Sequence, residues 1–140
     1  MDMTIELIML PVADAERAKD FYVSKAGFVL ETDNSPAPGM RVIQATPPGS
    51  SCSIVFGEGM LDASAPGRVI GTHLVVKDIV AARDELVGRG VEVSPIRHMT
   101  PQGWADGPHP DREDYNSFAD FADPDGNTWV LQERKELKPR

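Results

Sequence analysis

Cysteine is almost absent from this chain, and other features that would narrow its class are missing as well. The single Cys52 cannot form an internal disulfide, so we expect a reduced, cytoplasmic setting. The 14 lysine and arginine residues are outnumbered by 22 aspartate and glutamate residues, and the net charge of -8 disfavours nucleic acid, because phosphate contacts need clustered basic side chains. No apolar run approaches the roughly 20 residues that span a bilayer, and no secretory leader pattern opens the sequence. We therefore expect neither nucleic acid nor membrane as a partner.

The chain does contain one pattern twice. The first copy carries Leu10, Val12, Asp14, Ala18 and Asp20, and the second repeats them at a constant offset as Leu74, Val76, Asp78, Ala82 and Asp84. Each copy predicts an apolar strand, an aspartate that caps a helix, an amphipathic helix and further strands. We interpret the repeat as one duplicated supersecondary unit, and two such units usually enclose a cleft. The predicted modules are residues 1–57 and 71–134, joined by a linker at 58–70 within a single domain of 140 residues.

Strand and helix signals alternate in the same order in both copies. The first copy predicts a strand at 5–12, a helix capped by Asp14, and strands at 28–32, 41–46 and 51–56. The second predicts a strand at 72–76, a helix capped by Asp78, and strands at 91–97, 117–122 and 128–133. The last two strands are joined by a hairpin turn at 123–127, where proline, glycine and asparagine favour a reversal.

Three segments resemble a known superfamily. They are LPVADAERAKDFYVSKAGF from Leu10 to Phe28, LVVKDIVAARDELVGRGV from Leu74 to Val91, and DPDGNTWVLQE from Asp123 to Glu133. In this order they resemble the glyoxalase, bleomycin-resistance and extradiol dioxygenase superfamily, also called the vicinal oxygen chelate family. The resemblance implies an α+β fold in which two tandem βαβββ modules form a curved mixed sheet around a cup that holds a small-molecule ligand. It also implies a homodimer.

Enzymes of that superfamily usually hold a divalent metal on side chains that project into the cup. The positions to which the resemblance assigns these ligands carry Leu7, Ile54, Gly71 and Val130. None of the four has a donor atom in its side chain, whereas transition metals need imidazole, thiolate or carboxylate ligands. We therefore expect the family metal site to be absent, and no cofactor.

Side chains alternate along a strand, so the same face should carry the neighbours two positions away. This predicts a largely apolar cup with ligand-binding residues Met9, Gln44, Cys52, Phe56, Val75, Thr128 and Gln132, and with His73 as the candidate catalytic group. His73 is either a proton-transfer group or a histidine whose bonds are satisfied in the core. Thr128 and Gln132 either orient a ligand or bond the backbone, and Cys52 is a small buried apolar residue rather than a nucleophile.

The segment 98–116 lacks a periodic pattern and exceeds the roughly 12 to 15 residues of an ordinary loop. Its Trp104 either closes over a ligand or covers the rim of the barrel. The histidines and aspartates of the segment are a poor metal site, because a flexible loop holds ligands loosely.

Two functions follow from these features. In the first, the protein binds a small organic molecule in an apolar cup without the family metal, either sequestering it or supporting metal-independent isomerase, lyase or hydrolase chemistry through His73. Trp104 and Phe56 would then be stacking surfaces. The alternative is a metal-dependent glyoxalase-type lyase or extradiol dioxygenase. That alternative requires strand bulges that turn His73 and Glu133 into the cup.

Overall fold

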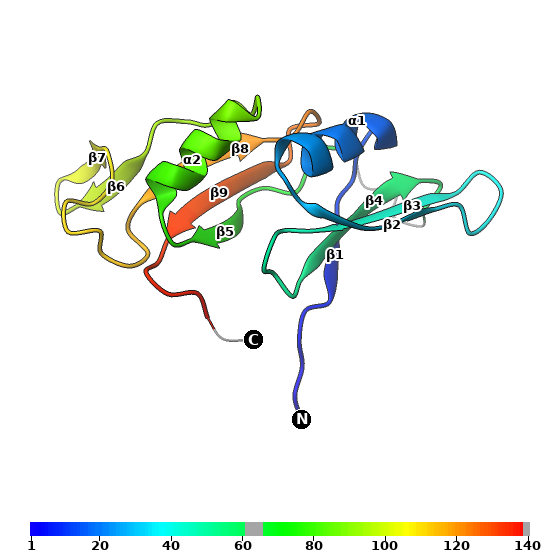
Figure 1. Cartoon of the computed structure of the whole chain (residues 1–140), viewed down its shortest axis with the longest axis horizontal. Helices are drawn as coiled ribbons and strands as arrows, with labels where there is room; N and C mark the ends of the chain where they lie inside the picture. The colour runs from blue at the N-terminus through cyan, green and yellow to red at the C-terminus, as the bar shows by residue number, and fades with distance from the viewer. Residues whose placement is uncertain (61–65, 139–140) are drawn as a thin grey trace. The chain divides into compact units, whose positions relative to one another are not determined.

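The computed structural model describes residues 1–60 and 66–138 (Figure 1). Its contacts divide the chain into two units, which we call unit 1 and unit 2. Unit 1 consists of Met1–Val69 and Asp123–Asn127, and unit 2 consists of Ile70–Ala122 and Thr128–Arg140. The turn expected at 123–127 thus belongs by its contacts to unit 1. The linker expected at 58–70 includes residues 61–65, which lie outside the described residues.

Unit 1 is a four-stranded sheet with one helical segment. Its strands are β1 (Leu7–Met9), β2 (Val29–Asn34), β3 (Arg41–Thr46) and β4 (Ser53–Glu58), in the order β1-β4-β3-β2. The outer strand β1 pairs with β4 in parallel, and the other pairs are antiparallel. The segment between β1 and β2 forms α1 (Ala15–Lys19), which continues as the π-helical turn η1 (Asp20–Lys25). Helix α1 begins where predicted, because the Asp14 carboxylate accepts a hydrogen bond from the Arg17 amide.

The core of unit 1 lies between this helical segment and one face of the sheet. Helix α1 contacts β3 and β4, and Figure 1 shows it lying across them. Tyr22 is fully buried, and its ring centroid lies 5.6 Å from that of Phe56. Its hydroxyl donates to the Asp123 carboxylate at 2.7 Å, so the one polar atom of this side chain is satisfied.

Unit 2 repeats this plan with an additional hairpin. Its elements are β5 (Thr72–Val76), α2 (Ile79–Gly88), β6 (Arg97–Thr100), β7 (Gly103–Asp106), β8 (Phe118–Ala122) and β9 (Thr128–Glu133), and the sheet order is β5-β9-β8-β6-β7. Strand β5 pairs with β9 in parallel. Helix α2 contacts β8 and β9, and the rings of Phe121 and Trp129 stack beneath it at 6.1 Å. The predicted α+β class is confirmed.

The segment 91–106 departs from prediction. The strand expected at 91–97 is not formed: β6 begins only at Arg97, and in the residues before it the Arg83 guanidinium donates to the carbonyl oxygens of Val93 and Ser94 at 3.0 and 2.7 Å. The sheet resumes later with the β6–β7 hairpin, inside the segment predicted to lack structure. Neither helical region of the described residues is long and apolar enough to cross a membrane.

Candidate functional site

The sheet of unit 2 has a helix on one face and leaves the other open. We call the second the open face of unit 2. Val130 lies near its centre, with His73 opposite on β5 and Asp120 opposite on β8. Along β9 the positions two residues away are Thr128 and Gln132, and alternation places their side chains on the same face. Four polar side chains therefore surround one aliphatic residue.

Hydrogen bonds fix the orientation of three of these side chains. His73 Nδ1 lies 2.7 Å from the Gly71 carbonyl oxygen, which only accepts, so the neutral ring carries its proton on Nδ1 and keeps a lone pair on Nε2. Gln132 Nε2 donates to the carbonyl oxygen of Tyr115 at 3.1 Å. Thr128 Oγ1 accepts from the Gly71 amide at 2.7 Å. The site is therefore preorganised before any ligand arrives.

An aromatic and ionic cluster continues this face toward β6 and β7. The Arg97 guanidinium holds the Asp120 carboxylate through both of its oxygens, at 2.8 and 3.2 Å. The same guanidinium lies 4.8 Å from the ring centroid of Trp104, which meets Phe118 edge to face at 5.5 Å. Trp104 nevertheless remains 55% exposed, so its ring is available to a ligand.

A hollow of about 500 Å³ opens beside Val130. It is lined by Ile70, Gly71, Asp120, Phe121, Ala122, Thr128, Trp129 and Val130, all within unit 2. The sequence prediction had placed Gly71, Thr128 and Val130 on a common face, together with His73, Val75 and Gln132, and the register of β5 and β9 agrees with that placement. Asp120, Arg97 and Phe118 were missed. For Asp120 and Phe118, the signal in the sequence is the alternation of Phe118, Asp120 and Ala122 along β8.

The open face of unit 1 has a different composition. Leu7 and Met9 on β1 pair with Ser53 and Val55 on β4, so these four side chains share one face. The prediction that Ile54 and Phe56 belong to it is wrong by one residue, since Phe56 is fully buried on the helix side against Tyr22. Val55 therefore corresponds to Val130, and Phe56 is a core residue rather than a stacking surface.

The other residues predicted in unit 1 occupy different surroundings. Gln44 pairs with Val55 and is half-buried on the open face. Cys52 precedes β4, and its Sγ lies 3.7 Å from the Ser53 carbonyl oxygen. All three histidines of the chain belong to unit 2, so no imidazole of unit 1 is available to activate this thiol.

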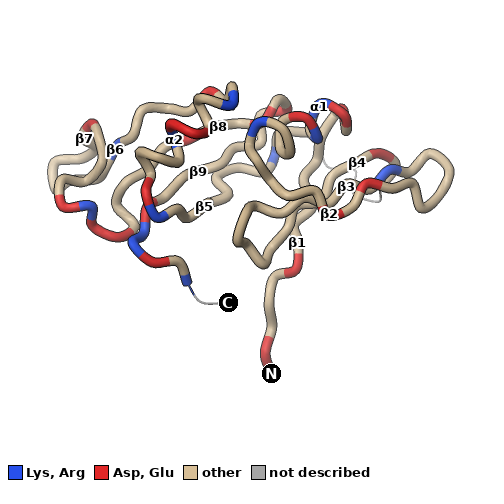
Figure 2. The backbone as a smooth tube through the Cα atoms, viewed as in Figure 1, with Lys and Arg blue, Asp and Glu red and all other residues tan. Residues whose placement is uncertain are grey.

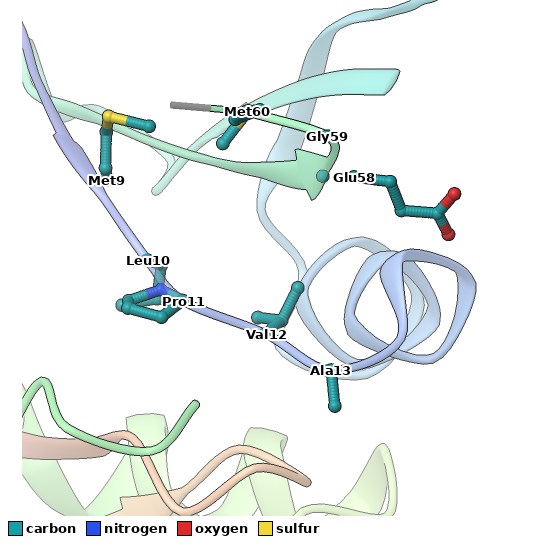
Figure 3. A pocket seen from close by; sticks show the side chains of 9 residues that line it. Met9, Leu10, Pro11, Val12, Ala13, Glu58, Gly59 and Met60 are labelled. Carbon is teal, nitrogen blue, oxygen red and sulfur yellow. The ribbon is translucent and has the colours of Figure 1, made fainter. Parts of the chain in front are cut away.

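Unit 1 also contains a pocket of about 260 Å³ where β1 and β4 end. It is lined by residues 9–13 and 57–60, and Figure 3 shows the Glu58 carboxylate directed away from Met9 and Met60. Its walls are largely backbone and aliphatic side chains. No side chain that the figure labels brings a charged group into it, so the open face of unit 2 is the better candidate site.

Comparisons with known proteins identify the superfamily. A family model described as the Glyoxalase/Bleomycin resistance protein/Dioxygenase superfamily matches residues 4–131. The chain belongs to this superfamily. TnmS3, an antibiotic-binding protein from Streptomyces sp. CB03234, is 32% identical, with a TM-score of 0.72 over 94% of this chain and 96% of that one.

Two further relatives extend this set. A superfamily member from Sphaerobacter thermophilus is 31% identical, with a TM-score of 0.72 over 95% of this chain and 98% of its own. The uncharacterized protein YetH from Bacillus subtilis is 23% identical over 92% of this chain and 97% of its own length. In both comparisons the match covers nearly the whole length of the relative.

The metal that superfamily enzymes use does not fit the residues present here. With the corrected register, the corresponding positions are Leu7, Val55, Gly71 and Val130, and none carries a donor atom. Within residues 1–60 and 66–138, no group of three or more histidine, cysteine, aspartate or glutamate side chains is arranged to hold a metal ion. The histidines and aspartates of the segment 98–116 are among the side chains that form no such group.

Glu133 does not supply the missing carboxylate. Strands β5 and β9 pair residue for residue without a bulge, which places Glu133 on the helix side, where it is buried. Its carboxylate accepts two bonds from the Arg112 guanidinium, at 2.9 and 2.7 Å, and one from the Ile79 amide at 2.9 Å. The bonds from Arg112 lower the pKa of Glu133, with a smaller lowering from the Ile79 amide. This residue anchors the loop before β8 to the start of α2.

Charged residues are interspersed along both units (Figure 2). On the open face of unit 2 the charges of Arg97 and Asp120 compensate each other. This face therefore presents paired charges, aromatic rings and fixed hydrogen-bonding groups, together with the aliphatic Val130.

Proposed function

We propose that this protein binds a small organic molecule on the open face of unit 2 and holds it without the family metal. The observation that carries the proposal is the aliphatic Val130 at a position where superfamily enzymes place a metal ligand, because Val130 offers an organic molecule an apolar surface and offers a metal no donor atom. Sequestration is the function that this surface supports best. It requires contact area and orientation, and no reactive centre.

The aromatic cluster supports an aromatic ligand. On the same face as Val130, Phe118 on the neighbouring strand β8 and Trp104 on the outer strand β7 present ring surface, and the Arg97 guanidinium already lies over the Trp104 ring. TnmS3, an antibiotic-binding protein that is 32% identical over 94% of this chain, supports the same class of function.

The proposal is tested by metal analysis and by recovery of the ligand. Protein that has been dialysed without chelator should contain no stoichiometric divalent metal, and a bound aromatic compound should be recovered chemically unchanged. A stoichiometric transition metal would overturn the metal-free assignment. A reproducible product would overturn sequestration.

A second candidate function, metal-independent proton transfer, is supported by the fixed ring of His73. Its Nε2 lone pair is available on the open face, as a general base requires. If a turnover assay detects product, His73→Gln should abolish turnover while changing ligand affinity only a few fold. Unaltered turnover in this variant would eliminate the assignment.

We also propose a homodimer in a cytoplasmic setting, as expected from the resemblance and from the unpaired Cys52. Sedimentation velocity of the purified protein tests the first point. A monomer at micromolar concentration would overturn it.

A further inference from the structure

Most polar groups of the open face of unit 2 share one property. Of the four side chains that surround Val130, those of His73, Gln132 and Asp120 each present a hydrogen-bond acceptor, whereas the Thr128 hydroxyl accepts from the Gly71 amide and keeps its own hydrogen to donate. We propose that the ligand of this face is a hydrogen-bond donor, an aromatic molecule bearing phenolic or similar O–H or N–H groups, and that His73 and Gln132 read those groups. The inference rests on the proposed function and specifies its ligand class.

His73 contributes an acceptor because its other nitrogen is already committed. Nδ1 donates to the Gly71 carbonyl oxygen at 2.7 Å, so the neutral ring can only accept at Nε2. The side chain is exposed, and this nitrogen has no other partner among the bonds of the described residues. A ligand hydroxyl can donate a hydrogen bond to this nitrogen.

Gln132, like His73, is oriented so that it presents an acceptor. An amide side chain offers both donors and an acceptor, but Nε2 is bound to the Tyr115 carbonyl oxygen at 3.1 Å. The amide oxygen then points away from Tyr115. Gln132 lies between Val75 and Phe118 across the sheet, so this oxygen is framed by apolar surface. A ligand hydroxyl adds a hydrogen bond at this oxygen, whereas an ether, which has no donor, cannot.

Asp120 adds a negative charge to the same set. Arg97 occupies one lone pair on each carboxylate oxygen, and a carboxylate has about four such sites, so acceptor capacity remains. An anionic ligand would approach this oxygen at a cost, whereas a hydroxyl would add a bond. The arrangement therefore discriminates against carboxylates as well as against ethers.

Three naphthalene probes of similar shape test the proposal on the intact protein by equilibrium dialysis. They are naphthalene-2,6-diol, 2,6-dimethoxynaphthalene and naphthalene-2,6-dicarboxylate. We expect the diol to bind at least about tenfold more tightly than the dimethoxy compound, since each neutral hydrogen bond contributes about threefold to tenfold. The dicarboxylate should bind most weakly.

Substitutions then assign the preference to its residues. Gln132→Leu and His73→Leu should each reduce the preference for the diol by about threefold to tenfold. Affinity for the dimethoxy compound should stay within about twofold, which also reports that each variant is folded. Gln102→Leu, at an exposed position in the β6–β7 turn, is the matched control and should retain the full preference.

The outcomes separate the two levels of the argument. Equal binding of the diol and the dimethoxy compound, tightest binding of the dicarboxylate, or an undiminished preference in both His73→Leu and Gln132→Leu would overturn the donor inference and leave the proposed function standing. Failure of all three probes to bind at millimolar concentration would overturn the proposed function, and the inference with it.

Discussion

The two sheets have the same plan but present different chemistry on their open faces. In unit 1 this face carries Leu7, Met9 and Val55, with the hydroxyls of Thr46 and Ser53 bonded to each other at 2.7 Å. In unit 2 the position equivalent to Val55 is Val130, and polar side chains surround it. The two copies therefore share the framework of strands and helix and differ in the polarity of this face. Under the proposed function, recognition chemistry is concentrated in the second copy.

The largest expected effect tests which side of the sheet of unit 1 is buried, the one with Phe56 or the one with Met9. Phe56 is fully buried against Tyr22, whereas Met9 is 39% exposed on the opposite side of the same sheet. Phe56→Ala should lower the free energy of unfolding by about 3–5 kcal/mol through lost burial and a cavity. Met9→Ala, the control, should lower it by less than about 1 kcal/mol. Urea unfolding measures both, and equal effects would show that the face assignment of β4 is incorrect.

A smaller effect concerns one paired carboxylate in each unit, Glu133 in unit 2 and Asp33 in unit 1, which we call the anchors of the two units. Glu133 is buried and bound by Arg112 in unit 2, so Glu133→Gln should cost about 2 kcal/mol at neutral pH. The folded-state pKa of Glu133 lies below the ordinary value of 4.5, so its stabilising contribution is present above that value and is lost as the pH falls through the folded-state pKa. The variant should therefore show a flatter decline of stability in acid.

The corresponding measurement in unit 1 uses Asp33. Bonds from Arg41, and then from Lys19, hold the pKa of Asp33 well below its usual range. Both tryptophans belong to unit 2, so their fluorescence follows that unit. Glu133→Gln in unit 2 should therefore shift the fluorescence transition in acid more than Asp33→Asn in unit 1. Equal shifts would show that the two anchors do not act on separate units.

Trp104 gives the next effect, on binding rather than on stability. Because its ring is 55% exposed, Trp104→Ala should change the free energy of unfolding by less than about 1 kcal/mol. The loss of stacking surface should weaken naphthalene-2,6-diol binding about threefold to tenfold. Calorimetric titration measures the affinity. An unchanged affinity would remove the aromatic cluster from the proposed site.

The smallest effect is expected at Gln44, an amide on the open face of unit 1. Gln44→Leu should change the preference for the diol over its dimethyl ether by less than about twofold, whereas Gln132→Leu reduces it. Equilibrium dialysis with the same probes measures both. A loss at Gln44 as large as that at Gln132 would show that the two open faces share recognition of the ligand.

Much of the fold was predictable because its signals are local. The aspartate caps at Asp14 and Asp78, and the strands 41–46, 72–76 and 128–133, are observed where the sequence placed them. The face of β4 was not predictable, because a shift of one residue in its register with β1 exchanges its two faces, and nothing in a strand with apolar residues at both faces opposes that shift. Likewise Asp120 and Arg97 meet only because β6 and β8 are neighbours in the sheet.

The sequence by itself determined the duplicated strand and helix pattern, the superfamily, and the lack of donor atoms at the metal positions, because these depend on residue type and spacing. Only the tertiary structure decided which side chains surround Val130 and in which direction His73 and Gln132 offer their hydrogen bonds. Those properties depend on the pairing of strands distant in sequence and on backbone carbonyls brought beside them. They exist only once the sheet has formed.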